Sequence, residues 1–446
     1  MSSGSPHRCP SRRREAEGQT MTRQGVVLTA VSALEILDSR GNPTVQVTLV
    51  TDDGRSWVAG VPSGASTGTR EAVELRDGDA ARYGGKGVTR AVANVNGEIA
   101  DLLVGRSWDS LADLDAATIE LDGTPTKARL GANALVGVSM AAARAFAGEQ
   151  PLWQSLQPGG VTPRLPVPHF NVLNGGVHAP NDLDFQEFMI APVGAPSFPE
   201  AVRAGAAVYG RLRALLRDRG ENTGLGDEGG FAPNIARPEN VLSVIVQAIR
   251  DAGYSAGMDG VAIALDPAAS EFYRDGAYHV AGETLSSADM IARYEQIAAD
   301  FPVWSLEDGL AEGDWDGWHQ LTARLGGRLQ LVGDDIFVTN PAIISEAIDR
   351  KVGNSALIKL NQIGTVTETL EAQRICREAG YTQMISHRSG ETADSFIADL
   401  AVATGTGQLK TGAPARGERV AKYNRLLEIA AAEAAMGYGL TTPAAR

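Results

Sequence analysis

Cysteine is almost absent from this sequence of 446 residues, which contains only Cys9 and Cys376. These two cysteines provide neither a disulfide framework nor the spacing of a zinc site. Long apolar runs are missing as well, since no stretch approaches the roughly 18 residues that span a membrane. Both absences fit a protein of a reducing compartment, so we expect a cytoplasmic location without a membrane span.

Basic residues are in the minority, because 40 Lys and Arg stand against 54 Asp and Glu, giving a net charge of −14. An acidic protein repels nucleic acid and anionic membranes, so neither is expected as a partner. This charge does not exclude small anionic substrates, because a few local cations can hold them. The content of 43% hydrophobic and 21% charged residues is typical of a soluble globular protein.

The chain is expected to divide into two folded domains with short ends. Residues 1–22 include Arg12-Arg13-Arg14 and lack the apolar segment of a signal peptide, so we predict a disordered extension. A turn-forming segment, Gln157-Pro158-Gly159-Gly160, marks the boundary between a first domain, 23–157, and a second domain, 158–440. Residues 441–446 are predicted to form a tail.

The first domain is predicted to be an α+β unit that begins with a three-stranded meander and continues with helices. Its predicted strands are 26–39, 44–51 and 55–61, and its predicted helices are 69–76, 88–103 and 132–147. Between strand and helix lies Pro62-Ser63-Gly64-Ala65-Ser66-Thr67-Gly68, which predicts a mobile loop that offers hydroxyl and backbone groups. Most loops of this composition are simply turns, so this signal is weak by itself.

The second domain repeats a pattern of apolar strand, polar residue and helix. The polar residues that follow the strands are Asp266, Glu307, Asp334, Lys359, His387 with Arg388, and Lys410, at spacings of 23 to 41 residues. This period indicates a parallel (β/α) barrel, in which the strand ends converge on one catalytic face. The two opening strands, 166–173 and 185–191, are joined by a segment too short for a crossover helix, so we expect them to be antiparallel. Helices 200–218 and 239–251 follow, which predicts the order ββαα(βα)6 of a TIM-like barrel.

The converging residues indicate a metal and a base. Asp266, Glu307 and Asp334 supply only oxygen, which suits Mg²⁺ or Mn²⁺ rather than zinc. Lys359 either reaches solvent at its strand end or serves as a desolvated base with a lowered pKa, and the ring of carboxylates favours the base. Metal and base together can remove a proton from a carbon next to a carboxylate.

The remaining polar residues indicate an anionic substrate. Arg388 with Ser389 suits a phosphate, so we expect a substrate that carries both carboxylate and phosphate. Glu228 lies in a glycine-dense turn, 224–230, which is either a solvated turn or a support that holds this acid at the barrel mouth. His178 has a structural and a catalytic interpretation, and the structural one is the more common for a lone histidine.

On these residues the sequence resembles the enolase (phosphopyruvate hydratase) family of bacterial type, from about residue 33 to residue 437. The resemblance is carried by Asp38-Ser39-Arg40-Gly41-Asn42-Pro43-Thr44, the loop 63–68, the turn 226–230 and Ser386-His387-Arg388-Ser389-Gly390-Glu391-Thr392. It implies a Mg²⁺-dependent lyase of glycolysis and gluconeogenesis that interconverts 2-phosphoglycerate and phosphoenolpyruvate.

The resemblance also implies a role for each matched residue. Lys359 corresponds to the base that removes the C2 proton, and Glu228, with Glu187 beside it, to the acid that assists loss of the C3 hydroxyl. The ligands of the first Mg²⁺ correspond to Asp266, Glu307 and Asp334, and the ligand of a second Mg²⁺, bound with substrate, to Ser66. The substrate contacts and lining residues correspond to His178, Gln186, Asp335, His387, Arg388, Ser389 and Lys410.

Two alternatives from other classes accompany this interpretation. One is a superfamily dehydratase of another carboxylate substrate, against which the Ser66 loop and the Arg388-Ser389 pair argue. The other is an additional binding role at the cell surface, from a secreted pool or as a scaffold. The family further implies a homodimer with charge pairs between the meander and the last helix, but Leu34 and Gln46 stand at two of the charged positions.

Overall fold

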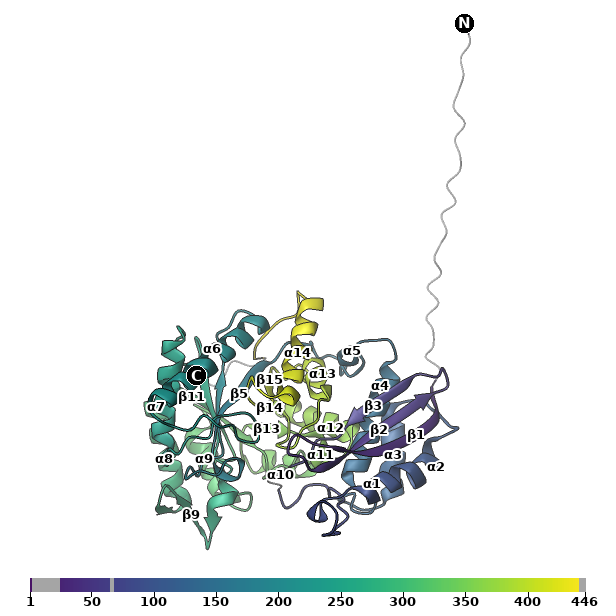
Figure 1. Cartoon of the computed structure of the whole chain (residues 1–446), viewed down its shortest axis with the longest axis horizontal. Helices are drawn as coiled ribbons and strands as arrows, with labels where there is room; N and C mark the ends of the chain where they lie inside the picture. Colours follow the sequence, from purple (N-terminus) through teal and green to yellow (C-terminus); the bar gives the residue numbers. More distant parts are fainter. Residues whose placement is uncertain (2–24, 65–67, 441–446) are drawn as a thin grey trace.

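The computed structural model describes Met1 and residues 25–64 and 68–440. Figure 1 shows two units side by side, a smaller one built from the early part of the chain and a barrel built from the rest. Apart from Met1, the predicted extension 1–22 and the predicted tail 441–446 lie outside the described residues. The predicted domain boundaries stay a prediction.

The smaller unit begins with the predicted meander. Strands β1 (Val26–Leu37), β2 (Pro43–Thr51) and β3 (Ser56–Gly60) pair antiparallel in sequence order. A fourth strand of two residues, β4 (Ser107–Trp108), adds to the free edge of β1 and was not predicted. Alternate residues of β2, such as Val47, are buried, which is the pattern of a sheet with one covered face.

Helices cover the buried face of this sheet. The alanine-rich helix packs directly on β2 and β3, and a Cβ added at its Gly137 would lie only 2.7 Å from Val47, so the small residue permits close contact. The predicted helix 88–103 is interrupted by a π-helical segment, and a further helix was missed by the sequence analysis. The observed elements are α1 (Thr89–Asn94), η2 (Val95–Ile99), α2 (Ala100–Leu103), α3 (Leu111–Asp122) and α4 (Ala132–Ala147).

The predicted helix 69–76 is wrong, because this segment is irregular. Its backbone N–H groups donate to distant partners instead of to one another: Ala72 to the carbonyl of Gln362 and Val73 to that of Thr126. These long-range bonds tie the segment to both domains. The segment therefore bridges the smaller unit and the barrel.

The barrel closes with eight strands, in the order β11-β12-β13-β14-β15-β5-β6-β7. Only β6 runs antiparallel to its two neighbours, and all other pairs are parallel, as the predicted order requires. The strands are β5 (Val167–Asn174), β6 (Glu187–Ala191), β7 (Ala262–Asp266), β11 (Val303–Glu307), β12 (Gln330–Gly333), β13 (Ser355–Ile358), β14 (Thr382–Ser386) and β15 (Gln408–Lys410). Nearly all of their residues are buried, which explains their continuous apolar sequences.

Helices surround the barrel in the predicted ββαα(βα)6 order. Two follow β6 and one or two follow each later strand, with a small three-stranded sheet inserted after β7. The elements are α6 (Phe198–Asp218), α7 (Pro238–Asp251), β8 (Tyr273–Arg274), β9 (Ala277–Val280), β10 (Glu283–Leu285), α8 (Ser287–Asp300), α9 (Trp315–Leu325), α10 (Pro341–Asp349), α11 (Leu360–Ile363), α12 (Val366–Glu378), α13 (Phe396–Ala403) and α14 (Gly417–Ala432). Among the described residues, no helix combines the length and the apolar character needed to cross a membrane.

The reversed direction of β6 matters for the site. Because β6 is antiparallel, its first residue, Glu187, pairs with the last residues of both neighbours, Asn174 and Asp266. Glu187 therefore lies at the same end of the barrel as the carboxyl ends of the parallel strands.

Candidate active site

The predicted site residues come together at the end of the barrel where its parallel strands finish. Asp266, Glu307 and Lys410 are the last residues of their strands, and Asp334 and Lys359 follow directly after theirs. A small polar cavity at this end is lined by His178, Gln186, Glu187, Glu228, Asp266, Asp334, Lys359, Ser386, His387, Arg388, Ser389 and Lys410. The fold thus places most of the predicted residues around one cavity; of those that the structure describes, Glu307 and Asp335 are not among its lining residues.

If cavity volume alone were used to choose the site, it would point to a different part of the molecule. A cavity of about 710 Å³ lies in the smaller unit, between the start of β1, the turn after β2 and the end of α4. None of the predicted site residues that the structure describes lines it. We therefore identify the site by its chemistry, namely the convergence of buried acids and bases.

Lys359 is held by a carboxylate rather than by solvent. Its Nζ donates to Oδ2 of Asp334 at 2.6 Å. Burial lowers the pKa of Lys359, but the carboxylates of Asp334 and Glu307 raise it, and the net shift is upward. The expected lowered pKa is wrong for this arrangement, because the ion pair outweighs burial. A cation that takes over Asp334 would weaken this ion pair and shift the pKa back down.

Lys410 is a buried cation that lies among three carboxylates. Its Nζ lies 2.6 Å from Glu307, 3.1 Å from Asp266 and 3.3 Å from Glu187. Burial lowers the pKa of Lys410, but the three carboxylates raise it well above its usual value. Lys410 is therefore charged at every physiological pH and partly neutralises this group of acids.

Carboxylates nevertheless outweigh cations here. Burial and the nearby charges of Asp266 and Asp334 raise the pKa of Glu307 well above its usual value. Burial and the charge of Asp335 do the same to the pKa of Asp308. Among the described residues, Oε2 of Glu307 has no hydrogen-bond partner. An all-oxygen donor set with this excess of negative charge fits a hard divalent cation.

The acids gather somewhat differently from the predicted ligand set. In this structure Lys410 bridges Asp266 and Glu307, while Asp334 turns to Lys359. Carboxylate oxygens of Asp334, Asp335 and Asp308 lie within 4.8 Å of one another. Of the three predicted ligands of the first Mg²⁺, Asp334 alone belongs to this cluster, in which Asp308 and Asp334 are buried and Asp335 is partly buried.

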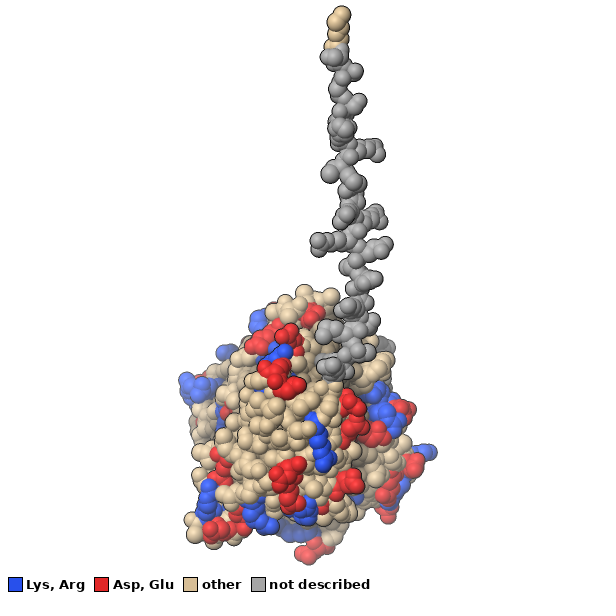
Figure 2. Space-filling view, turned by 90° about the vertical axis from the view of Figure 1, so that its right-hand side faces the viewer, with Lys and Arg blue, Asp and Glu red and all other residues tan. Residues whose placement is uncertain are grey.

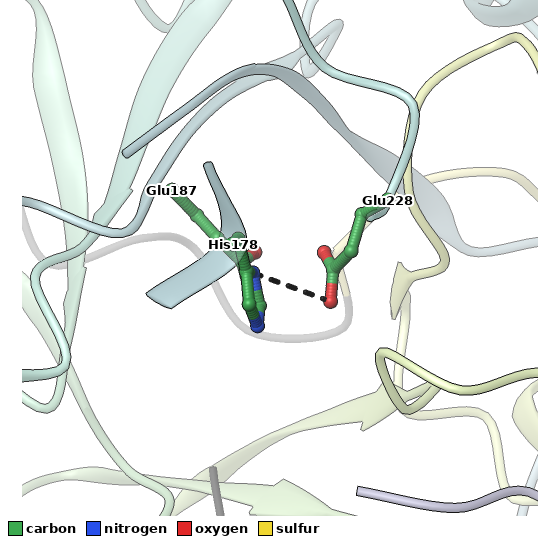
Figure 3. Close-up of side chains that lie close together, drawn as sticks. All are labelled: His178, Glu187 and Glu228. Atoms are coloured by element: carbon green, nitrogen blue, oxygen red, sulfur yellow. Dashed lines mark ion pairs between the residues drawn. The ribbon is translucent and has the colours of Figure 1, made fainter. Parts of the chain in front are cut away.

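A second acidic group faces this ring from β6 and the turn 224–230. Figure 3 shows His178 between Glu187 and Glu228, with Nδ1 of the histidine 3.8 Å from a carboxylate oxygen of each. Burial and the charge of Glu228 raise the pKa of Glu187 well above its usual value. Burial lowers the pKa of His178, which keeps this imidazole neutral. Burial and the nearby charge of Glu228 therefore favour the protonated form of Glu187.

Glu228 itself is stabilised as a carboxylate. Its Oε2 accepts a hydrogen bond from Nδ2 of Asn171 at 3.0 Å and lies 3.1 Å from Nε2 of His387. Burial raises the pKa of Glu228, but His387 and His178 lower it, and the net shift is well below its usual value. Burial lowers the pKa of His387 to about 4, so its imidazole is neutral near pH 7.

Arg419 determines which nitrogen of His387 carries the proton. Its Nη1 lies 2.5 Å from Nδ1 of His387 and also donates to the carbonyl of Arg388. Because a guanidinium only donates, Nδ1 of the neutral imidazole accepts and Nε2 carries the hydrogen that faces Glu228. Arg419 is fully buried on α14, a helix whose sequence gave no catalytic signal.

Arg388 and Ser389 follow β14 and line the cavity from the side of the smaller unit. The guanidinium of Arg388 donates to the carboxylate of Glu71 and to Oδ1 of Asn361. Ser66, the predicted ligand of a second Mg²⁺, lies outside the described residues. Glu71 and Asn361 were not predicted, since only the fold brings them to Arg388.

Several other site residues were missed by the sequence analysis. Asp308 accepts the backbone N–H groups of Asp334 and Asp335 at 2.8 and 2.9 Å, which fixes this turn of acids. Gln362 donates to Oδ1 of Asp334 at 2.8 Å. The signal for Asp308 was present, because it directly follows Glu307 at a strand end, whereas Gln362 reads as an ordinary helical residue.

Comparison with known proteins agrees with this geometry. The family model described as enolase, N-terminal domain matches residues 28–156, and that described as enolase, C-terminal TIM barrel domain matches residues 162–439. The enolase of Acidothermus cellulolyticus is 59% identical over 406 residues, covering 90% of this chain and 94% of that protein. The enolase of Rubrobacter xylanophilus is 56% identical over 407 residues, with the same coverage. At this identity and coverage, the chain belongs to the enolase family.

Proposed function

We propose that Lys359 and the Glu187–Glu228 pair divide the two proton transfers of the enolase reaction between them. The observation that carries this proposal is that the lysine and both glutamates line one buried cavity. Lys359, once neutral, takes the proton from C2 of 2-phosphoglycerate, and the electron pair left behind forms the C2–C3 double bond as the C3–O bond breaks. The glutamate pair supplies the proton with which the hydroxyl leaves as water.

The proton supply follows from the coupling of the two glutamates. Glu187 carries a proton because burial and the neighbouring charge of Glu228 raise its pKa. Glu228 is ionised beside His178 and His387, so the acid acts as a pair with one shared proton rather than as one residue. We assign Glu228 as the residue that contacts the departing hydroxyl, with Glu187 as its proton reservoir.

The remaining residues hold the substrate and its metal. Asp266, Glu307 and Asp334 would bind Mg²⁺, and Ser66 a second Mg²⁺ that arrives with substrate. When bound, Mg²⁺ supplies the positive charge that stabilises the negative charge developing on the substrate carboxylate. The other contacts would come from Arg388 and Ser389 to the phosphate, from Lys410 to the carboxylate, and from His178, Gln186, Asp335 and His387 along the walls.

Two inferences about the whole protein belong to this proposal. We infer a homodimer, supported by the family and by exposed apolar side chains on β1, where Leu34 is 49% exposed and Leu37 is 58% exposed. We also infer a cytoplasmic location, supported by the scarcity of cysteine in the sequence.

Separating the two proton transfers tests the assignment. Lys359→Ala should abolish both exchange of the C2 proton with solvent and formation of phosphoenolpyruvate. Glu228→Gln should abolish product but retain C2 exchange, because the base is left in place. The loss should be about 10²–10⁴-fold or more for each affected step. Wild-type C2 exchange in Lys359→Ala would show that another group is the base.

A further inference from the structure

The guanidinium of Arg388 is already paired with a carboxylate from the other domain. Nη1 donates to Oε2 of Glu71 at 3.0 Å and Nη2 donates to Oε1 at 3.2 Å, which is a bidentate pair. The side chains are 3% and 9% exposed. Arg388 lies after β14, whereas Glu71 lies in the irregular segment 68–77, 317 residues away in sequence.

Glu71 is held in this position by two further donors. Its Oε1 accepts the backbone N–H of Gly68 at 3.1 Å and Nε2 of Gln362 at 3.3 Å. The same Nε2 donates to Oδ1 of Asp334 at 2.8 Å. Glu71 therefore presents two oxygens to Arg388 in the way that a phosphate would, while it remains tied to the residues next to Lys359.

We propose that Glu71 is an internal counter-anion of Arg388 that competes with the substrate phosphate and so sets the affinity of the site. This inference rests on the proposed role of Arg388 in phosphate binding. A guanidinium buried without an anion is costly, so Glu71 keeps Arg388 in place before substrate binds. A dianionic phosphate can displace one carboxylate charge from a guanidinium, whereas a weakly charged ligand cannot.

The surroundings allow this exchange. A cavity of about 290 Å³ adjoins the pair and is lined in part by Gly68, Glu71, Arg76 and Arg388. The carboxylate of Glu71 can turn into this space without moving a strand of the barrel. Arg76 also lines this space, where it is already paired with Glu74, another lining residue, at 2.6 Å.

The opposite role is that Glu71 orients Arg388 for phosphate, and the two roles predict opposite changes in affinity. Glu71→Gln keeps the size and an acceptor oxygen but removes the charge. We expect it to bind inorganic phosphate about tenfold more tightly than the wild type in calorimetry with Mg²⁺ present, because a larger fraction of Arg388 is available. The KM for 2-phosphoglycerate should fall as well.

A matched control removes a charge beside the same segment without touching Arg388. Oε2 of Glu312 accepts the backbone N–H of Thr69 at 3.1 Å, and Glu312→Gln should leave phosphate affinity unchanged. Glu71→Asp keeps the charge. It should therefore bind phosphate about as the wild type does, and more weakly than Glu71→Gln. If Glu71→Gln bound phosphate as the wild type does, or more weakly, the proposed competition between Glu71 and phosphate for Arg388 would be refuted.

A fourth variant separates this inference from the proposed function. Arg388→Met should lose phosphate binding. If it instead binds phosphate like the wild type, the role of Arg388 is wrong and the counter-anion inference falls with it. If it loses binding while Glu71→Gln shows no gain, the proposed function stands and the counter-anion role alone is refuted. Thermal unfolding of each variant verifies that it is folded.

Discussion

Lys410 shows how strongly the charge states of the site depend on one side chain. It contacts Glu187, Asp266 and Glu307 within 3.3 Å, and it is 2% exposed. The pKa values of Glu187 and Glu307 are therefore linked to the presence of a single ammonium group, whose charge lowers both.

Replacing Lys410 should destabilise the fold, and Mg²⁺ should restore part of the lost stability. Lys410→Met leaves buried carboxylates without their partner, which we expect to destabilise the fold by about 3–5 kcal/mol. Added Mg²⁺ should recover more stability in this variant than in the wild type, because the freed acids gain a cation. Thermal unfolding with Mg²⁺ and with a chelator measures both effects.

The exposed Lys86 provides the control, since Lys86→Met removes the same charge from the surface. It should change neither the unfolding temperature nor its response to Mg²⁺. An equal response to Mg²⁺ in Lys410→Met and in the wild type would show that the acids around Lys410 do not bind the ion.

At this scale, the sequence revealed residues whose chemistry is evident from their position at a strand end. Lys359, Asp266 and Asp334 all line the cavity. Residues that act through another side chain were invisible, because Glu71 and Arg419 reach their partners only through contacts between segments that are far apart in sequence. The direction of the pKa shift of Lys359 was likewise missed, since burial alone suggested a decrease while the Asp334 carboxylate reverses it.

Among the elements, helix α12 joins the two domains close to the base. The backbone N–H of its first residue, Val366, donates to Oγ of Ser139, and the N–H of Thr367 donates to Oδ2 of Asp115. Asp115 lies on α3 and Ser139 on α4, so the smaller unit satisfies the free N–H groups at the start of a barrel helix. This contact lies eight residues after Lys359.

Asp115 should make the stability of this contact depend on pH. Its Oδ1 has no partner among the described residues, and burial raises its pKa to about 6 despite the hydrogen bonds from Thr367 and Ser139. An acid with a raised folded-state pKa stabilises the fold fully below its unfolded value, near 4. This contribution is lost as the pH rises through about 6.

Asp115→Asn should remove this dependence. The amide oxygen can keep the hydrogen bonds without a charge, so the variant should gain up to about 3 kcal/mol relative to the wild type between about pH 4 and pH 7. Thermal unfolding of both proteins across this range measures the difference, with the exposed Asp101→Asn as a control. If the difference in stability between Asp115→Asn and the wild type were the same at about pH 4 and at about pH 7, the titration of Asp115 would be refuted.

The elements that were predicted correctly have local signals. Strand β13 is continuously apolar and ends at Lys359, and helix α12 begins after Thr365, whose side chain accepts the N–H of Glu368. Segment 69–76 has helical composition, yet its N–H groups bond to Gln362 across the domain interface and to Thr126 within the smaller unit. Such contacts leave no periodic signal in the sequence.

For the whole molecule, the net charge of −14 is spread rather than concentrated on the face shown in Figure 2. Acidic and basic side chains are interspersed there, with continuous uncharged areas between them. This is the side on which the β1–β3 sheet lies in Figure 1. An association through this side need not rely on charge.

The sheet offers an uncharged surface for a second copy. Leu34 is 49% exposed and pairs directly across the β1–β2 ladder with Gln46, at the positions where the family resemblance implies charged side chains. Val58 on β3 is 43% exposed. In the last helix, Glu428 is paired with Arg425 of its own chain at 3.3 Å. The proposed dimer would therefore be held by apolar and amide contacts.

Salt should then have little effect on the dimer. Salt weakens ion pairs by screening their charges, and the Debye length is about 8 Å at physiological ionic strength. Apolar contacts are not weakened by salt. We expect the sedimentation of the wild type to show the same dimer fraction at low and high salt over a range of protein concentrations.

Leu34→Asp should dissociate at higher concentration than the wild type, because a charge would be buried in an apolar contact. Val104→Asp, at an exposed apolar position after α2, is the matched control and should remain dimeric. Dissociation that increased steeply with salt would require interface ion pairs that Leu34 and Gln46 cannot form, and it would refute this account of the dimer.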